Sequence, residues 1–148
     1  MGLFGPSPRS NGSRSSVGAE STAIIAAKLV QSGYVVLTPY GSIHLHDLLI
    51  EDAEGQFWRL WCRTAWFSKD RTAILFDGSS PFEKKVAARR SSLKEKSRND
   101  VDYFAVYHPR LHKVYLLPAL HIAQGENFLQ LTPKGREQEG MWAGDYEM

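Results

Sequence analysis

The stretch from Ser42 to Phe67 constrains the fold most, because it predicts two apolar strands joined by a tight turn. The first strand is expected over Ile43 to Ile50 and the second over Phe57 to Phe67, with the turn sequence Asp-Ala-Glu-Gly between them. The remaining elements are expected to be arranged around this β-hairpin.

Asp47 is the exceptional residue of the first strand. Side chains alternate along a strand, so Asp47 faces the same side as Leu45 and Leu49. An ionised carboxylate among leucines needs a partner. That partner is either a structural cation of the protein or a bound metal ion.

The register of the hairpin decides which residues Asp47 meets. If the loop has three residues and Gly55 supplies a positive φ, Asp47 lies opposite Trp61 and shares a face with Arg63. If the loop has four residues, Asp47 pairs with Leu60 and Arg63 points to the other face. The sequence leaves both registers open.

The composition is that of one globular domain. The chain has 148 residues, of which 43% are hydrophobic and 23% are charged. The single cysteine, Cys62, excludes an intramolecular disulfide and suits the reduced cytoplasm. No apolar run approaches the roughly 20 residues of a membrane span, so no membrane association is expected. The net charge of +2 is too small to indicate nucleic-acid binding by itself.

The N-terminal part predicts a flexible basic tail followed by a helix. Residues 1–16 contain Arg9 and Arg14 but no acidic residue, and they show no periodicity. Apolar residues at helical spacing then predict a helix from Val17 to Gln31. Glu20 precedes Ile24 by one turn, which places it on the buried stripe. Glu20 therefore either stabilises the helix dipole or belongs to a site.

Further strands and a short helix are expected downstream. The strands are predicted over Tyr34 to Thr38, Thr72 to Phe76, Val101 to Tyr107, Lys113 to Leu117 and Phe128 to Leu131, and the helix near Ala119 to Gln124. The folded domain thus spans residues 17–131. Residues 132–148 are expected to fray, although Trp142 and Tyr146 could pack back.

One segment concentrates positive charge. Glu83 to Arg98 holds seven basic and two acidic residues. Such a run is either a solvated face or a surface that contacts phosphates. Its basic residues are the candidates for DNA binding: Lys84, Lys85, Arg89, Arg90, Lys94, Lys96 and Arg98.

Four local patterns follow one another along the chain: Gly18-Ala19-Glu20 before Gly33-Tyr34, Pro39-Tyr40-Gly41 before Asp47, Gly55 to Leu60 leading into Arg63-Thr64-Ala65, and Asp102 to Tyr107. Their order resembles the PD-(D/E)XK nuclease superfamily, and closest to it the small endonucleases associated with group I introns. The resemblance implies an α/β (α+β) fold of the restriction-endonuclease type, a single domain with a mixed β-sheet flanked by helices.

In that family, the resemblance implies, a helix glutamate and a strand aspartate coordinate Mg²⁺, with Mn²⁺ as a possible substitute. Glu20 and Asp47 fall on these two positions. The next strand of the family supplies an acidic or amide residue two positions before a lysine, where this chain has Trp61 and Arg63. Tryptophan offers only an N–H donor, and arginine stays protonated, so Arg63 can stabilise phosphate charge but cannot accept a proton.

Three functions from different classes follow. The first is a Mg²⁺-dependent endonuclease for duplex or branched DNA, with Glu20 and Asp47 as metal ligands and Arg63 on the phosphate. The second is a catalytically inactive module that binds DNA through its basic segment. The third is a structural or protein-interaction domain. For the first, a homo-oligomer would be the natural way to cut both strands.

Overall fold

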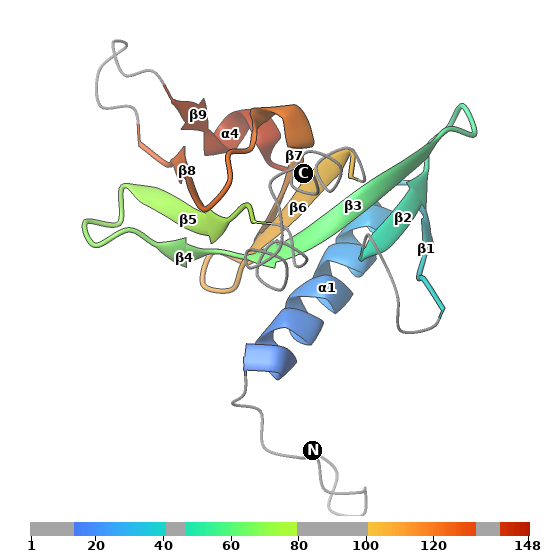
Figure 1. The fold of residues 1–148 in the computed structure, drawn as a ribbon, viewed down its shortest axis with the longest axis horizontal. Coiled ribbons are helices and arrows are strands. Elements are labelled where there is room, and N and C mark those ends of the chain that lie inside the picture. The colour runs from blue at the N-terminus through green and yellow to red at the C-terminus, as the bar shows by residue number, and fades with distance from the viewer. Residues whose placement is uncertain (1–13, 41–46, 80–100, 133–139) are drawn as a thin grey trace, which may run out of the picture.

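Two β-sheets and one long helix form the computed structural model, which describes residues 14–40, 47–79, 101–132 and 140–148 (Figure 1). The elements follow in the order α1 (Arg14–Gln31), β1 (Val35–Leu37), β2 (Leu48–Glu51), β3 (Phe57–Thr64), β4 (Trp66–Phe67), β5 (Ala73–Asp77), β6 (Tyr103–His108), β7 (Lys113–Pro118), the 3₁₀ turn η1 (Ala119–His121), β8 (Glu126–Gln130), β9 (Met141–Trp142) and α4 (Ala143–Tyr146).

Sheet A has the strand order β1-β2-β3-β6-β7, and sheet B has the order β4-β5-β8-β9. Each sheet combines antiparallel pairs with one parallel pair, β3 with β6 in sheet A and β8 with β9 in sheet B. The predicted mixed sheet with flanking helices is confirmed, but its strands are divided between two sheets. None of the helices in the described ranges is long and apolar enough to cross a bilayer.

The hairpin of β2 and β3 adopts the three-residue loop. Gly55 has φ +77°, and the N–H of Asp52 bonds to the carbonyl of Gln56 over 2.9 Å. Leu48 pairs with Leu60, and the same register places Asp47 opposite Trp61. The alternative with a four-residue loop is therefore wrong. The Asp52 carboxylate in this turn accepts the Trp58 indole N–H, which lowers the pKa of Asp52.

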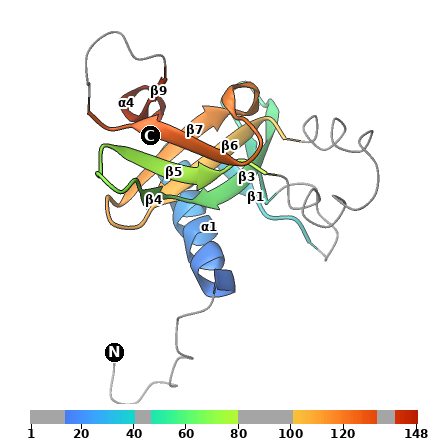
Figure 2. The same cartoon turned by 60° about the vertical axis from the view of Figure 1, so that its left-hand side comes forward.

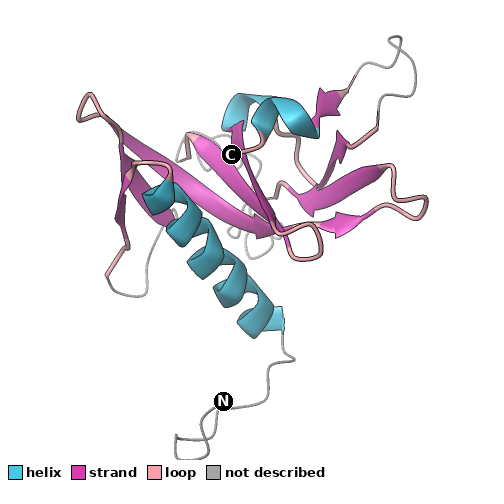
Figure 3. Cartoon of the chain, turned by 180° about the vertical axis from the view of Figure 1, so that it is seen from behind, coloured by secondary structure: helices cyan, strands magenta, loops and turns pink. Residues whose placement is uncertain are grey.

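Helix α1 covers one face of sheet A (Figure 3). Ser21, Ile25 and Leu29 repeat every four residues, and all three are buried against the sheet. Glu20 lies one position off this stripe and is exposed, so its predicted burial is wrong. The helix begins at Arg14, three residues earlier than predicted. It ends as expected at Gln31, and Gly33, with φ +96°, closes the last turn.

The core has two parts, one on each face of sheet A. Leu48, Ile50 and Leu60 pack with Ile25 and Leu29 between α1 and the sheet. Apolar residues of β6 and β7 on the other face pack against sheet B, which lies beside sheet A in Figures 1 and 2. β3 thus contributes side chains to both parts of the core.

The chain passes from sheet A to sheet B at Ala65. The predicted strand from Phe57 to Phe67 is divided there into β3 and β4, and the Ala65 N–H bonds to the carbonyl of Tyr107 over 2.8 Å. β5 then pairs with β4 and β8 and ends next to Gly78. A Cβ atom at Gly78 would overlap the Ala123 carbonyl oxygen and the Asn127 amide, so this position requires glycine.

The C-terminal residues 140–148 form β9 and α4, so the predicted fraying is wrong for these residues. Tyr146 packs back as considered, with its hydroxyl 3.0 Å from His121 Nδ1. The N–H of Met148 bonds to the carbonyl of Val114 over 3.0 Å. These contacts attach the C-terminal residues to β7 and η1.

Candidate functional site

Strand β3 presents alternate side chains to the two faces of sheet A. Leu60 and Cys62 point toward α1, and Trp61 points toward sheet B. Thr64 shares the helix side, because its hydroxyl lies 2.6 Å from that of Ser21. By alternation, Arg59 and Arg63 share the face of Trp61.

Asp47 stands immediately before β2, beside the middle of β3. Its Oδ2 accepts the Cys62 N–H over 2.8 Å and lies 3.6 Å from Arg63 Nη1. Because β2 begins only at Leu48, the carboxylate replaces a strand carbonyl as the acceptor for Cys62. Burial, with the charge of Asp47 as the second cause, raises the pKa of the Cys62 thiol to about 12, so the thiol is protonated at neutral pH.

Arg63 joins the two sheets. Its Nε donates to the Asp77 carbonyl over 3.0 Å, and Nη2 donates to the Ser79 carbonyl over 2.9 Å. Its Nη1 donates to the Cys62 carbonyl over 2.8 Å. Burial lowers the pKa of Arg63, while Asp47 and Asp77 oppose that shift, and a guanidinium keeps its charge at neutral pH. Only 16% of the side chain is exposed, so the cation is held inside the protein.

Trp61 belongs to the hydrophobic core. It is 2% exposed, and its ring meets Phe104 edge-on at 5.4 Å between centroids. The guanidinium of Arg63 lies 5.4 Å from the Trp61 ring and 5.5 Å from the Phe104 ring. These two rings and the carbonyls enclose the arginine on several sides.

Glu20 is placed near this region by α1 but is not directed into the sheet. Its neighbour Ser21 contacts Thr64, so the N-terminal half of the helix lies beside the end of β3. Glu20 itself is exposed. Within the described ranges, no group of three or more His, Cys, Asp or Glu side chains is arranged to hold a metal ion.

The described residues around Asp47 do not fit the divalent metal implied by the resemblance. Mg²⁺ prefers several oxygen ligands in octahedral geometry. Trp61 supplies no oxygen, and Oδ2 of Asp47 is already engaged by Cys62 and faces Arg63. The positive charge that a metal would bring next to Asp47 is supplied instead by the guanidinium.

The seven basic residues predicted to bind DNA, from Lys84 to Arg98, lie outside the described residues. The described residues on either side of that segment are attached to β3. Arg63 binds the Ser79 carbonyl, and Arg59 binds the Asp102 carboxylate through Nε and Nη2, each over 3.1 Å. Both attachments therefore come from the same face of one strand.

Sequence reasoning missed the Arg59 and Asp102 pair and the contact between Ser21 and Thr64. Asp102 also accepts the Arg59 backbone N–H over 2.8 Å, which aligns β6 with β3. A charged residue in each of two neighbouring apolar strands was a usable signal, because such charges need partners. The Ser21 contact had no comparable signal, since isolated serines are common on helices.

The comparison with known proteins agrees with the architecture. The profile of the family described as PD-(D/E)XK endonuclease matches residues 13–148. The solved structure of a bacterial homing endonuclease, I-Ssp6803I, is similar with a TM-score of 0.64 and 22% sequence identity, over 92% of this chain and 87% of that chain. No curated protein matches the chain in sequence. The resemblance deduced from the sequence is confirmed, and the chain belongs to the PD-(D/E)XK endonuclease family.

Proposed function

We propose that this protein binds DNA as a member of its nuclease family and does not hydrolyse DNA through Asp47. The observation that carries the proposal is the buried guanidinium of Arg63 beside the Asp47 carboxylate. DNA is the substrate that membership of an endonuclease family implies. The internal cation replaces the metal-binding arrangement expected for catalysis.

Arg63 is also poorly placed to act on a phosphate itself. A guanidinium has five N–H donors. Three of those on Arg63 point to the carbonyl oxygens of Asp77, Cys62 and Ser79. A residue bound in this way holds the polypeptide together, so its predicted role on the scissile phosphate is not supported by these contacts.

DNA binding is proposed to use the basic segment. Its flanks start from Ser79 and Asp102, which Arg63 and Arg59 fix to the face of sheet A that α1 does not cover. Seven lysine and arginine residues within this segment would contact phosphates and release counterions. The affinity should therefore fall steeply with salt and depend little on DNA sequence.

A closed circular plasmid tests binding and cleavage in one sample. With Mg²⁺ or Mn²⁺ present, the protein should retard the plasmid without converting it to the nicked form. Changing Lys84, Lys85, Arg89 and Arg90 together to Ser should weaken retardation and reduce the slope of affinity against salt by about 3 to 4. Unchanged affinity and slope in that variant would show that the segment is only a solvated face.

A gain-of-function variant tests the account of Asp47 more directly. The double change Trp61→Glu with Arg63→Lys supplies an oxygen ligand and a base whose pKa burial can lower. If only these parts are missing, the variant should bind Mg²⁺ and nick plasmid, and Asp47→Ala should remove both gains. Trp61 lies in the core, so circular dichroism must first show that the variant is folded.

The second candidate function is a metal-dependent DNA endonuclease. It is favoured by the exposure of Asp47, since 40% of this side chain remains accessible. Nicking by the unmodified protein that Asp47→Asn abolishes would select this function over the first. Nicking that Asp47→Asn leaves unchanged would point to contamination or to another site.

A further inference from the structure

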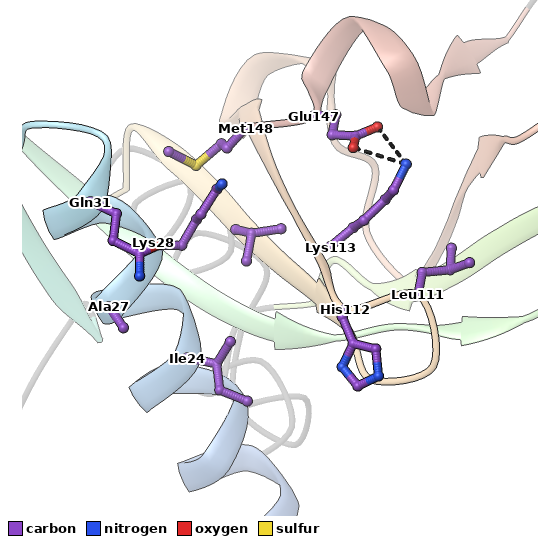
Figure 4. A pocket seen from close by; sticks show the side chains of 10 residues that line it. Ile24, Ala27, Lys28, Gln31, Leu111, His112, Lys113, Glu147 and Met148 are labelled. Atoms are coloured by element: carbon purple, nitrogen blue, oxygen red, sulfur yellow. Dashed lines mark hydrogen bonds and ion pairs between the residues drawn. The ribbon is translucent and has the colours of Figure 1, made fainter.

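The groove drawn in Figure 4 has its charged groups matched within the chain. It has a volume of about 450 Å³ and lies between α1, the start of β7 and the C-terminal residues. Lys113 Nζ lies 2.9 Å from the Glu147 carboxylate, and the hydrogen bond between them raises the pKa of Lys113. Lys28 projects from α1 toward Met148. The charged groups of this groove therefore face one another, whereas those on the outer face of sheet B lie apart.

The outer face of sheet B carries an apolar row that crosses three strands. Ile74 and Leu129 are buried on the inner face, against sheet A. Trp66 pairs with Leu75, and Leu75 pairs with Phe128, so these three side chains share the opposite face of β4, β5 and β8 (Figure 1). Trp66 is 46% exposed and Phe128 is 48% exposed. A contiguous exposed patch of this kind indicates an interaction surface.

Polar groups of opposite character flank this row. On one side Glu126 pairs with Asp77, which places two carboxylates next to the row. On the other side Ala73 pairs with Gln130, and Lys69 follows in the turn between β4 and β5. Glu126 and Lys69 are exposed, and neither forms an ion pair within the described ranges. The face is thus acidic at one end and presents an amide and an ammonium at the other.

The other two charges of that turn have partners inside the turn. Oδ1 of Asp70 accepts the hydroxyls of Ser68 and Thr72, each over 2.8 Å. The guanidinium of Arg71 lies 5.6 Å from the Phe67 ring. Lys69 is therefore the charge that the turn offers to another molecule.

We propose that the outer face of sheet B binds the same face of a second copy of this chain, with the strands of the two sheets antiparallel. A two-fold axis parallel to the apolar row places each residue of the row against its own counterpart. The same axis reverses the strand direction, so Glu126 of one copy lies against Gln130 and Lys69 of the other. Both ends of the interface are then complementary in charge.

This complementarity selects a second copy over nucleic acid as the occupant. Exposed aromatic rings on a sheet also stack with bases. The carboxylates of Asp77 and Glu126 border the row, however, and they would repel the phosphates of a bound strand. A second copy brings hydrogen-bond donors to that end.

The size of the face predicts a weak dimer. β5 and β8 have five residues each, which span about 17 Å, and the four strands of sheet B span about 19 Å. The face therefore covers at most roughly 300 Å² in plan, whereas a standard interface buries about 800 Å² on each partner. Monomer and dimer should thus be in reversible equilibrium.

Sedimentation velocity of the full chain tests the inference, without DNA and at about 10 μM to 1 mM. The sedimentation coefficient should rise with concentration from that of a monomer toward that of a dimer. Phe128→Arg should weaken association about tenfold or more, because the two-fold axis places the two introduced cations together. The matched control is Val30→Arg on α1, where the side chain is 59% exposed, and it should leave association unchanged. Equal association of the wild type and Phe128→Arg would overturn the inference.

Charge reversal tests the orientation of the two copies. Glu126→Lys and Lys69→Glu should each weaken self-association, and both positions are exposed, so the fold should be retained. An equimolar mixture of these two variants should associate as strongly as the wild type, because each contact of the mixed dimer again joins a carboxylate to an ammonium. A mixture that associates no better than the single variants would overturn the antiparallel arrangement.

The inference goes beyond the DNA binding proposed above, and the two can fail independently because these measurements contain no DNA. A protein that stays monomeric at 1 mM would refute self-association and leave the plasmid results untouched. A monomer that binds a fluorescein-labelled single strand, with that binding lost in Phe128→Arg, would assign the face to nucleic acid instead.

Discussion

Two arginines of β3, four residues apart on the same face, are bound in different ways. Arg59 makes a two-pronged ion pair with Asp102, and both side chains are partly exposed. Arg63 lies 3.6 Å from Asp47, but its shorter contacts, of 2.8 to 3.0 Å, are to three backbone carbonyls. Arg59 is thus positioned by a carboxylate. Arg63 is positioned by backbone carbonyls and only lies next to a carboxylate.

The two arginines therefore differ in what their removal should cost the protein. An ion pair at the surface contributes little to stability and is easily replaced. A buried cation with several backbone acceptors is expensive to remove, because those acceptors lose their partners. Arg63 therefore stabilises the junction of the two sheets.

The largest expected effect is the difference in stability between variants that lack one or the other arginine. Arg63→Met should lower the free energy of unfolding by about 3 to 5 kcal/mol, since it breaks a buried charged network. Arg59→Met should lower it by only about 1 to 2 kcal/mol, because that pair is more exposed. Urea unfolding followed by tryptophan fluorescence measures both. Equal losses would contradict the distinction between the two arginines.

An intermediate effect is expected at the two carboxylates. Asp102→Asn should cost about 1 to 2 kcal/mol, because Asp102 accepts three N–H groups of Arg59. Asp47→Asn should cost less than about 0.5 kcal/mol, because an amide oxygen can still accept the Cys62 N–H and Arg63 keeps its carbonyls. The same urea titration serves. If Asp47→Asn proves the more damaging, Asp47 is what holds Arg63 in place.

The smallest expected effect concerns His108, a buried base that can be compared with the buried cation Arg63. His108 is 1% exposed, its Nδ1 accepts the Leu111 N–H over 3.2 Å, and within the described residues Nε2 has no partner. Burial lowers the pKa of His108, with the charge of Arg110 as a minor cause, so the folded state holds this ring neutral. In contrast to Arg63, His108 would lose the hydrogen bond from the Leu111 N–H if its ring became charged.

The free energy of unfolding should therefore decrease as the pH drops below about 6.5, because His108 binds a proton in the unfolded chain more readily than in the folded protein. This contribution is complete above pH 6.5 and is lost as the pH drops toward the lowered folded pKa. Between pH 7 and pH 5, the wild type should lose more stability than His108→Gln does. Urea unfolding at the two pH values measures this difference, and equal losses for the two proteins would contradict the prediction.

Most elements of the fold could be predicted because they have a local signal. Gly55 and Gly33 mark a turn and a helix end, and both have the positive φ that those roles require. The change of sheet at Ala65 had no such signal, because the run from Phe57 to Phe67 contains no Gly or Pro to mark where the strand leaves one sheet for another. The C-terminal elements were also missed, since short polar segments are ordered only by tertiary contacts.

The candidate site could be predicted only in part. Placing Asp47 beside Trp61 and Arg63 needed only the alternation of a strand and the correct loop length. The prediction that Glu20 is buried was wrong, because it followed the apolar periodicity through Ile24. The buried stripe of the helix runs instead through Ser21, whose hydroxyl is hydrogen-bonded to Thr64. The carbonyl partners of Arg63 come from the end of β5, and no pattern in the sequence connects those positions.

Gly78 offers an internal standard for mutational experiments. Any side chain there would collide with Ala123 and Asn127, so substitutions should be lost from a random library whichever property is selected. Variants of the basic segment should disappear only under selection for DNA retention and should survive selection for resistance to proteolysis. The depletion of Gly78 under the second selection thus sets the scale for misfolding, and any position depleted only under the first selection contributes to recognition.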